Sequence, residues 1–101
     1  MNNTRRKELS EIIKDLGTVQ DKDDLYATIS ELECIKDDEQ YYYDNIPENL
    51  QCSQRADDSE EAIDNMEEAL YLLNMVYDAD EFDKNSGLIK EAIDKIEDAR
   101  Q

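Results

Sequence analysis

Histidine and tryptophan are absent from the sequence, which also contains only two glycines, one proline and two cysteines among its 101 residues. Histidine is the commonest metal ligand and the usual general base near neutral pH, so its absence argues against metal-dependent and acid–base catalysis. The sequence also has no glycine-rich phosphate-binding loop and no nucleophile elbow. We therefore expect a protein that is not an enzyme and that uses no cofactor and no metal.

Basic residues are also scarce, with 11 Lys and Arg against 28 Asp and Glu, which gives a formal net charge of −17 at pH 7. Phosphate backbones and anionic membranes repel such a chain, so we expect no direct binding to nucleic acid or to a membrane. No apolar run approaches the ~18 residues of a membrane span, and the basic residues 5–7 are not followed by the apolar stretch of a signal peptide. The sequence predicts a cytoplasmic protein.

The two cysteines, Cys34 and Cys52, do not form a CxxC pair and have no histidine to complete a zinc site. Nothing in the sequence indicates an oxidising compartment, where disulfides form and persist. We expect both residues to be free thiols.

Apolar residues recur at helical spacing along the chain, although a high net charge with low hydrophobicity is also typical of disorder. A first helix is predicted from Arg5, with Thr4 as its N-cap, to a stop at Gly17. The alternative is a helix that continues through Gly17. A second helix is predicted from the capping residues 21–24 toward Asn45, just before the single proline.

A polar turn is predicted over residues 47–57, and a third helix is predicted to follow Asp58, which begins a capping box. The apolar stripe of this helix keeps a seven-residue rhythm and is formed by Ile63, Met66, Leu70, Leu73 and Tyr77. The rhythm fails over residues 78–87. A last helix is predicted after this break, with Asn85 or Ser86 as its N-cap and a new apolar stripe that begins at Leu88.

These elements predict an all-α protein with a single domain over residues 1–101. The two central helices form an antiparallel hairpin, and the shorter terminal helices either extend it or fold back on it to make a bundle of three to four helices. Because a core of this size is small, a dimeric bundle is a further alternative.

The negative charge is concentrated in the middle of the chain. Residues 18–83 sum to −18, whereas the two ends together sum to +1. No Lys or Arg occurs from Glu60 to Asp83, although a solvated helix usually mixes both signs. Since both ends of an antiparallel hairpin meet at the same side, we expect a rod with a strongly negative body and a nearly neutral foot.

The central helices carry eighteen carboxylates, or one per ~2 Å along roughly 37 Å of helix. Duplex DNA carries one phosphate charge per ~1.7 Å of its axis. A surface that imitates DNA would attract a basic groove and steer it into place. The alternative is an acidic face that is only solvated and keeps a small protein in solution.

Three successive tyrosines, at positions 41–43, lie among carboxylates just before the predicted turn. They cover about 300° of a helix, so at least one ring must be exposed and can serve as a binding hot spot. In the alternative, Tyr42 and Tyr43 cover the end of the hairpin and Tyr41 lies along the surface. We expect the other three tyrosines to be partly buried: Tyr26, Tyr71 and Tyr77.

Residues 81–89 resemble part of an EF-hand calcium loop, with Asp83 and Asn85 as the first ligands and Gly87 as the turn glycine. The segment is one residue short, and Ile93 occupies the position of the bidentate glutamate. We therefore expect no specific calcium site, and a calcium-responsive switch is the least favoured class of function. We expect weak, diffuse binding of divalent cations to the acidic body instead.

Three segments carry a resemblance to a known group: residues 5–9 (RRKEL), residues 44–51 (DNIPENLQ) with Ser53, and residues 60–69 (EEAIDNMEEA). In these segments the chain is similar to small acidic helical-hairpin proteins from phages and prophages of Gram-positive bacteria. The resemblance implies a mobile-element origin and action in the host cell cytoplasm. Acidic DNA-mimic inhibitors of host defence nucleases or DNA-binding proteins recur in that setting. The group has no assigned activity, so no functional residue is transferred from it.

The preferred hypothesis is protein–protein binding, in which the acidic body occupies a basic nucleic-acid-binding surface of a host protein such as a defence effector. Nine carboxylates and one aromatic anchor are the predicted partner-binding residues: Asp37, Asp38, Glu39, Asp44, Glu60, Glu61, Asp64, Glu67, Glu68 and Tyr41. The alternative is a structural or assembly module that dimerises through its apolar stripe, formed by Ile63, Met66, Leu70 and Leu73.

Overall fold

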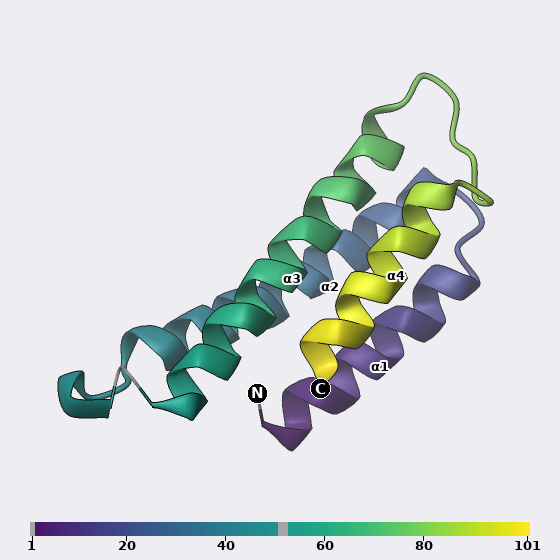
Figure 1. Ribbon diagram of the computed structural model, residues 1–101. Coiled ribbons are helices and arrows are strands. Elements are labelled where there is room, and N and C mark those ends of the chain that lie inside the picture. The colour runs from purple at the N-terminus through teal and green to yellow at the C-terminus, as the bar shows by residue number, and fades with distance from the viewer. Residues whose placement is uncertain (1, 51–52) are drawn as a thin grey trace.

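The computed structural model describes residues 2–50 and 53–101, and these residues form helices without any β-strand (Figure 1). The elements in chain order are α1 (Asn3–Gly17), α2 (Lys22–Asp44), the short 3₁₀ helix η1 (Glu48–Leu50), α3 (Gln54–Asp78) and α4 (Gly87–Arg100). The predicted all-α class is confirmed. Within the described ranges, no helix combines the length and the apolar character needed to cross a membrane.

The two long helices, α2 and α3, form an antiparallel hairpin, and α1 and α4 pack beside each other along it (Figure 1). α4 makes its most extensive contacts with α3, and α1 contacts both α2 and α4. The molecule is elongated, with extents of 49 × 22 × 18 Å. Because α1 and α4 are shorter, the connection between α2 and α3 projects beyond them (Figure 1). We call this end the hairpin tip (residues 44–50 and 53–56).

The terminal helices fold back along the hairpin, so the expected nearly neutral foot at one end of a rod is wrong. Each terminal helix carries an apolar stripe that must be buried, and the hairpin offers an apolar face long enough for both. Leu9 and Ile12 of α1 and Ile96 of α4 are at most 1% exposed in the resulting core. The near-neutral segments therefore cover one long side of the hairpin instead of one end.

Small residues allow α3 and α4 to pack closely. Ala62 and Ala69 on α3, and Ala92 and Ala99 on α4, repeat at seven-residue spacing, and all four are buried. The stripe considered for dimerisation lies in this same core and is buried within one chain: Ile63, Met66, Leu70 and Leu73. These side chains already have intramolecular neighbours and present little surface to a second copy.

The N-caps of α2 and α4 agree with the sequence pattern. The Asp21 side chain accepts a hydrogen bond from the Asp24 backbone N–H at 2.8 Å, and the Ser86 side chain accepts from the Leu88 N–H at 3.2 Å. α1 ends at Gly17, where the Thr18 N–H donates to the Asp15 carbonyl. The two interruptions predicted between helices are therefore confirmed.

Two other caps differ from the prediction. Asn2, not Thr4, caps α1, because the Asn2 side chain accepts from the Arg5 backbone N–H at 2.8 Å. Ser53, not Asp58, caps α3, so that Asp58 lies within the helix. The earlier start follows from burial: Ala56 and Ser59 continue the core face of α3 backward by one turn.

A buried polar cluster ties α1, α2 and α3 together. The Glu39 side chain is fully buried; its Oε1 accepts from Arg5 Nε at 2.8 Å, and its Oε2 accepts from Ser59 Oγ at 2.5 Å. Arg5 also lies against the Tyr42 ring, with 5.5 Å between its guanidinium carbon and the ring centroid. The prediction of Glu39 as a partner-binding residue is wrong, because position 39 lies on the same face of α2 as Leu32 and Ile35.

We predict that Glu39→Ala lowers the free energy of unfolding by about 2–4 kcal/mol, because it removes the carboxylate that pairs Arg5 and Ser59. The exposed Glu33→Ala on the same helix is the matched control and should change stability by less than about 0.5 kcal/mol. Urea unfolding followed by circular dichroism measures both values. Equal stabilities of the two variants would show that the cluster does not hold α1 on the hairpin.

Candidate functional site

α3 exposes a row of carboxylates along most of its length. All eight of its acidic residues are exposed: Asp57, Asp58, Glu60, Glu61, Asp64, Glu67, Glu68 and Asp78. Its single basic residue, Arg55, lies in the first turn. We call the dense central part, Glu60, Glu61, Asp64, Glu67 and Glu68, the acidic ridge. Its five carboxylates occur on average about every 3 Å along the helix, against ~1.7 Å for duplex DNA.

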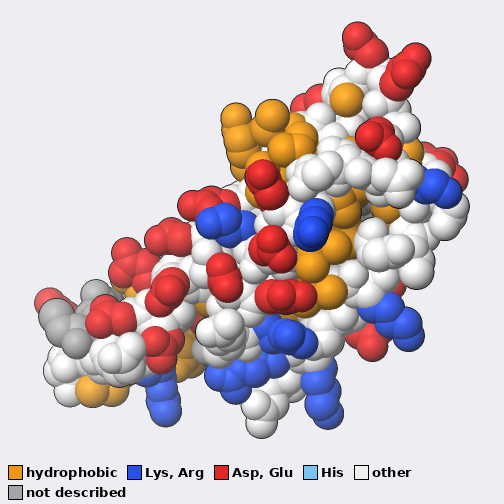
Figure 2. Space-filling model, turned by 45° about the vertical axis from the view of Figure 1, so that its right-hand side comes forward, with side chains coloured by type: hydrophobic (Ala, Val, Ile, Leu, Met, Phe, Trp, Pro, Cys, Tyr) orange, Lys and Arg blue, Asp and Glu red, His pale blue; other side chains and the backbone are white. Residues whose placement is uncertain are grey.

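The acidic ridge is a consequence of the way α3 is packed. The core takes the apolar face of the helix, so the carboxylates are left on the face that points to solvent. Figure 2 shows acidic side chains along the edge that runs from the hairpin tip, whereas most of the Lys and Arg side chains on that view lie lower. On this view the edge along the hairpin is therefore mainly acidic, and most of the Lys and Arg side chains lie away from it.

One edge of the acidic ridge borders α4. Lys95 Nζ lies 2.9 Å from Glu68 Oε2, and the hydrogen bond and charge of Glu68 raise the pKa of Lys95 above its ordinary value. Glu61 lies beside Asp98 and Ala99 at the end of α4. Among the described residues, the Lys95–Glu68 pair is the one ion pair that the ridge makes. The other four carboxylates have no basic partner there.

The other edge of the ridge borders α2. The Tyr43 hydroxyl donates to Glu60 Oε2 at 3.4 Å, and the negative charge of Glu60, with smaller contributions from Asp57 and Asp44, raises the pKa of Tyr43. Asp44 accepts from Gln40 at 2.9 Å. The structure thus brings Asp44 close to the Glu60 end of the ridge.

The remaining predicted residues are divided between two sides of α2. Asp37 lies two turns before Asp44 on the same side of the helix, and its carboxylate pairs with Lys36 at 3.4 Å. Asp38 and Tyr41 are exposed but line a pocket with Arg5, on the side of α2 that faces α1. With Glu39 buried, the predicted set is therefore a ridge of five residues, two carboxylates on one side of α2, of which Asp44 lies near the ridge, and two residues that line the pocket with Arg5.

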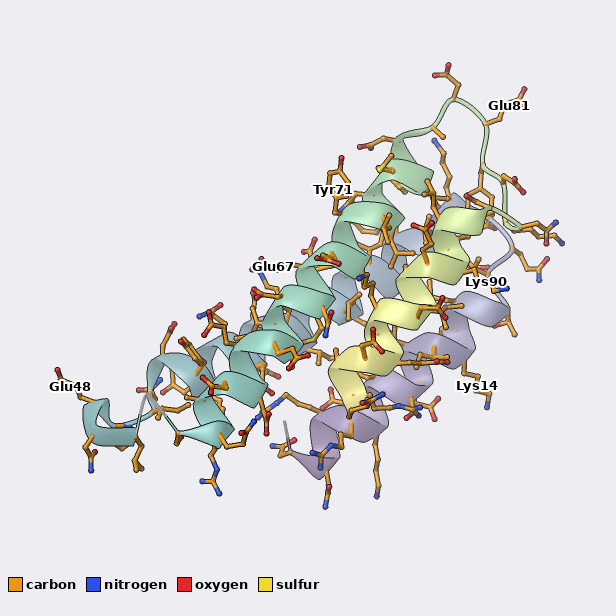
Figure 3. All side chains as sticks on the ribbon, in the orientation of Figure 1. Lys14, Glu48, Glu67, Tyr71, Glu81 and Lys90 are labelled. Atoms are coloured by element: carbon orange, nitrogen blue, oxygen red, sulfur yellow. The ribbon has the colours of Figure 1, made fainter. Side chains whose placement is uncertain are left out.

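Sequence reasoning missed an exposed tyrosine at the ridge. Tyr71 is 67% exposed and shares a shallow hollow with Asp64, Glu67 and Glu68. Figure 3 shows Tyr71 and Glu67 projecting from α3 to the same side, away from α4. The helical period could have placed it, because Tyr71 follows Glu67 by four residues and Asp64 by seven.

The expectation for the other tyrosines is therefore corrected in part. Tyr26 is 59% exposed, so neither it nor Tyr71 is partly buried as predicted. Tyr77 is half-buried as predicted, and its ring lies 5.8 Å from that of Tyr26. Lys22 Nζ lies 5.4 Å from the Tyr77 ring centroid, so these aromatic groups cover one another at the far end of the hairpin.

Two other sequence features form no site in the part of the chain that the structure describes. No group of three His, Cys, Asp or Glu residues within residues 2–50 and 53–101 is arranged to hold a metal ion. In the segment that resembles a calcium loop, Asp83 accepts a hydrogen bond from the Asn85 backbone N–H, and Gly87 is already the first residue of α4. Cys34 is an exposed free thiol, and Cys52 lies outside the described residues.

Comparisons of the chain with protein-family models, with curated proteins and with solved structures found no match. The function therefore has to be argued from the surfaces themselves. The acidic ridge is a dense row of exposed carboxylates with one ion pair among the described residues, and it is the candidate site.

We predict that Glu60→Gln lowers the pKa of Tyr43 toward its ordinary value, because loss of the Glu60 charge makes the phenolate less unfavourable. Since the pKa is raised, Tyr43 in the parent protein should lose its proton at higher pH than an exposed tyrosine. An NMR titration of the carbon-13-labelled tyrosine side chains measures both values. Glu67→Gln is the control and should leave the pKa of Tyr43 unchanged. An unchanged pKa of Tyr43 in Glu60→Gln would contradict the placement of Glu60 beside Tyr43.

Proposed function

We propose that the protein acts by binding another protein, and that its acidic ridge occupies a basic surface which the partner uses to bind nucleic acid. It would then inhibit that partner as a DNA mimic. The partner class that fits is a host nuclease or other DNA-binding protein, in line with the mobile-element origin that the resemblance implies. The observation that carries the proposal is the exposed ridge of five carboxylates with a single basic partner, Lys95, among the described residues.

The acidic ridge lowers the stability of α3, and this cost favours a role for the ridge beyond solvation. Glu60 and Asp64, and Asp64 and Glu68, are like charges at i, i+4, a spacing that destabilises a helix by a few tenths of a kcal/mol per pair. A surface that only kept the protein in solution would do so with mixed signs and without this cost. A groove rich in Lys and Arg would relieve the repulsion on binding.

The charge distribution also gives the proposed complex an orientation. α2 has eight acidic and two basic residues, and α3 has eight acidic and one basic. By contrast, α1 has three acidic and four basic residues, and α4 has four acidic and three basic. In Figure 3, Lys14 and Lys90 lie on the opposite side of the molecule from Glu67. A basic groove would therefore meet the hairpin, with α1 and α4 directed away from it.

The assembly alternative has less support, because the apolar stripe that would form the dimer is buried in one chain. Leu70 is 8% exposed and Met66 is fully buried. Substituting Leu70 with aspartate would therefore damage the monomer as well as any dimer, and cannot separate the two functions.

We predict that neutralising four ridge residues, with Glu60→Gln, Asp64→Asn, Glu67→Gln and Glu68→Gln combined, weakens partner binding at least about tenfold. The matched control neutralises four exposed acids on the other helices, with Glu8→Gln, Glu11→Gln, Glu91→Gln and Asp94→Asn combined. Both variants change the net charge equally, so a difference between them reports position. Proteins captured from the source cells by the immobilised parent protein are identified, purified and titrated with each variant.

The proposal requires the purified partner to bind nucleic acid, and duplex DNA to compete with the ridge for it. Affinity must also fall steeply as salt is raised, because screening shortens the reach of each charge. Equal affinity of the two quadruple variants for the partner would show that the ridge is only a solvated face. An affinity that changes neither with salt concentration nor with added duplex DNA would exclude DNA mimicry.

We predict that Tyr71→Ala weakens the same partner roughly tenfold, because an exposed ring among the ridge carboxylates can fill a pocket of the partner. Tyr41→Ala, which removes an equally exposed ring from the other side of the hairpin, is the control and should have little effect. Isothermal titration calorimetry with the purified partner compares the two. A larger loss for Tyr41→Ala would move the interface to the side of α2 that faces α1.

A further inference from the structure

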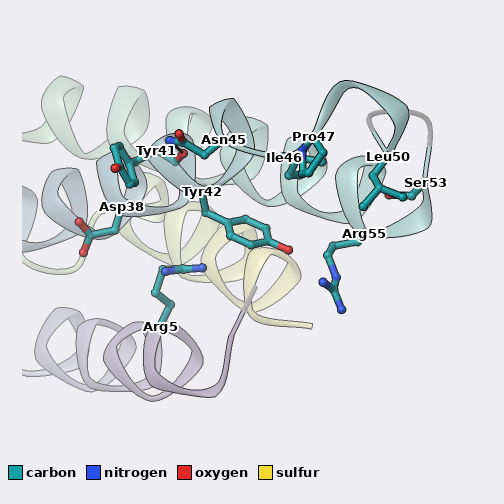
Figure 4. Close-up of a pocket in the computed structure, with 10 residues that line it drawn as sticks. All are labelled: Arg5, Asp38, Tyr41, Tyr42, Asn45, Ile46, Pro47, Leu50, Ser53 and Arg55. Carbon is teal, nitrogen blue, oxygen red and sulfur yellow. Dashed lines mark hydrogen bonds between the residues drawn. The ribbon is translucent and has the colours of Figure 1, made fainter.

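A pocket of about 600 Å³ lies beside the hairpin tip, between the last turns of α2 and the start of α1 (Figure 4). This volume falls within the range of small-molecule sites, which are mostly apolar with a few convergent polar groups. The pocket lies on the side of α2 opposite to the acidic ridge. It therefore belongs to a different surface from the one that carries the proposed function.

Apolar groups form most of the pocket wall. The Tyr42 ring lies across its floor, and Pro47 and Leu50 close it from the hairpin tip (Figure 4). Leu50 is 48% exposed and Tyr41 is 72% exposed. These side chains leave apolar area in contact with water, and an apolar ligand that covered it would gain free energy from its burial.

Two arginines are the basic residues that line the pocket. Arg5 uses its Nε to bond Glu39, and its guanidinium face lies on Tyr42. Its two terminal nitrogens have no hydrogen-bond acceptor among residues 2–50 and 53–101. Arg55 enters from α3 and has no ion-pair or hydrogen-bond partner among those residues. Arginine N–H groups in this arrangement suit a carboxylate.

The charges of the pocket allow for one anion. Arg5 is balanced by the buried Glu39, and Asp38 lies on the rim away from the hairpin tip (Figure 4). Arg55 is left as the uncompensated charge. A ligand with one negative group beside Arg55 would be complementary to this charge.

We propose that this pocket binds a small organic anion that has an aromatic or branched apolar body and one carboxylate. The body contacts Tyr42, Pro47 and Leu50, and the carboxylate accepts hydrogen bonds from Arg55. The site does not depend on the acidic ridge, and a ligand held there would bridge α1 to the hairpin tip.

The test uses 3-phenylpropionate as the probe and its amide, 3-phenylpropionamide, as the neutral analogue. Each is titrated into the nitrogen-15-labelled protein at physiological salt, where the net charge of the chain is screened beyond ~8 Å. We expect the acid to shift the backbone signals of residues 41–46 and 53–56 and to bind about tenfold more tightly than the amide.

Arg55→Gln should bring the affinity for the acid down to that for the amide, because it removes the unbalanced charge. Lys14→Gln, which removes one positive charge from an exposed site on α1 away from the pocket, is the control and should leave the affinity unchanged. Shifts confined to other parts of the chain, equal affinity for acid and amide, or an unaltered affinity in Arg55→Gln would each overturn the proposal. None of these results bears on partner binding by the acidic ridge.

Discussion

The packing of α1 and α4 along one side of the α2–α3 hairpin is the constraint on which the rest of the structure depends. Each terminal helix is too short and too polar to be stable alone, and each buries its apolar stripe against the hairpin. Once that side is covered, the carboxylates of α2 and α3 can be exposed to solvent only on the opposite side and at the edges of the hairpin. The charge asymmetry of the molecule is thus a result of where the core lies.

The Arg5–Glu39–Ser59 cluster adds a directional constraint to this hydrophobic packing. Apolar stripes alone permit small shifts of one helix along another, whereas a buried carboxylate held by two donors fixes the register of α1 and α3 against α2. Arg5 also forms part of the wall of the pocket beside the hairpin tip. Arg5 therefore contributes both to the stability of the bundle and to the shape of the pocket.

The two surfaces differ in the chemistry they offer. The acidic ridge is exposed and highly charged, and a single basic side chain pairs with it among the described residues, which suits a basic groove and fast, salt-dependent association. The pocket is concave and mostly apolar, and its arginines suit a single anion. Tyr41 and Asp38 were grouped with the ridge by their position in the sequence, but the rotation of α2 about its axis assigns them to the pocket side.

The sequence by itself determined the helices, their interruptions and the acidic stretch from Glu60 to Asp83, because these depend on local spacing, on capping and on composition. Periodicity could also have placed Glu39 inside and Tyr71 outside, since 39 continues the core face of α2 and 71 continues the acidic face of α3. It could not show that α1 and α4 fold back, or that Arg5 would reach Glu39. The Arg5–Glu39 bond joins residues 34 positions apart, and the Arg100–Ser10 bond between α4 and α1 joins residues 90 positions apart. Such contacts form only when the apolar stripes of separate helices find a common core, which is a property of the tertiary structure.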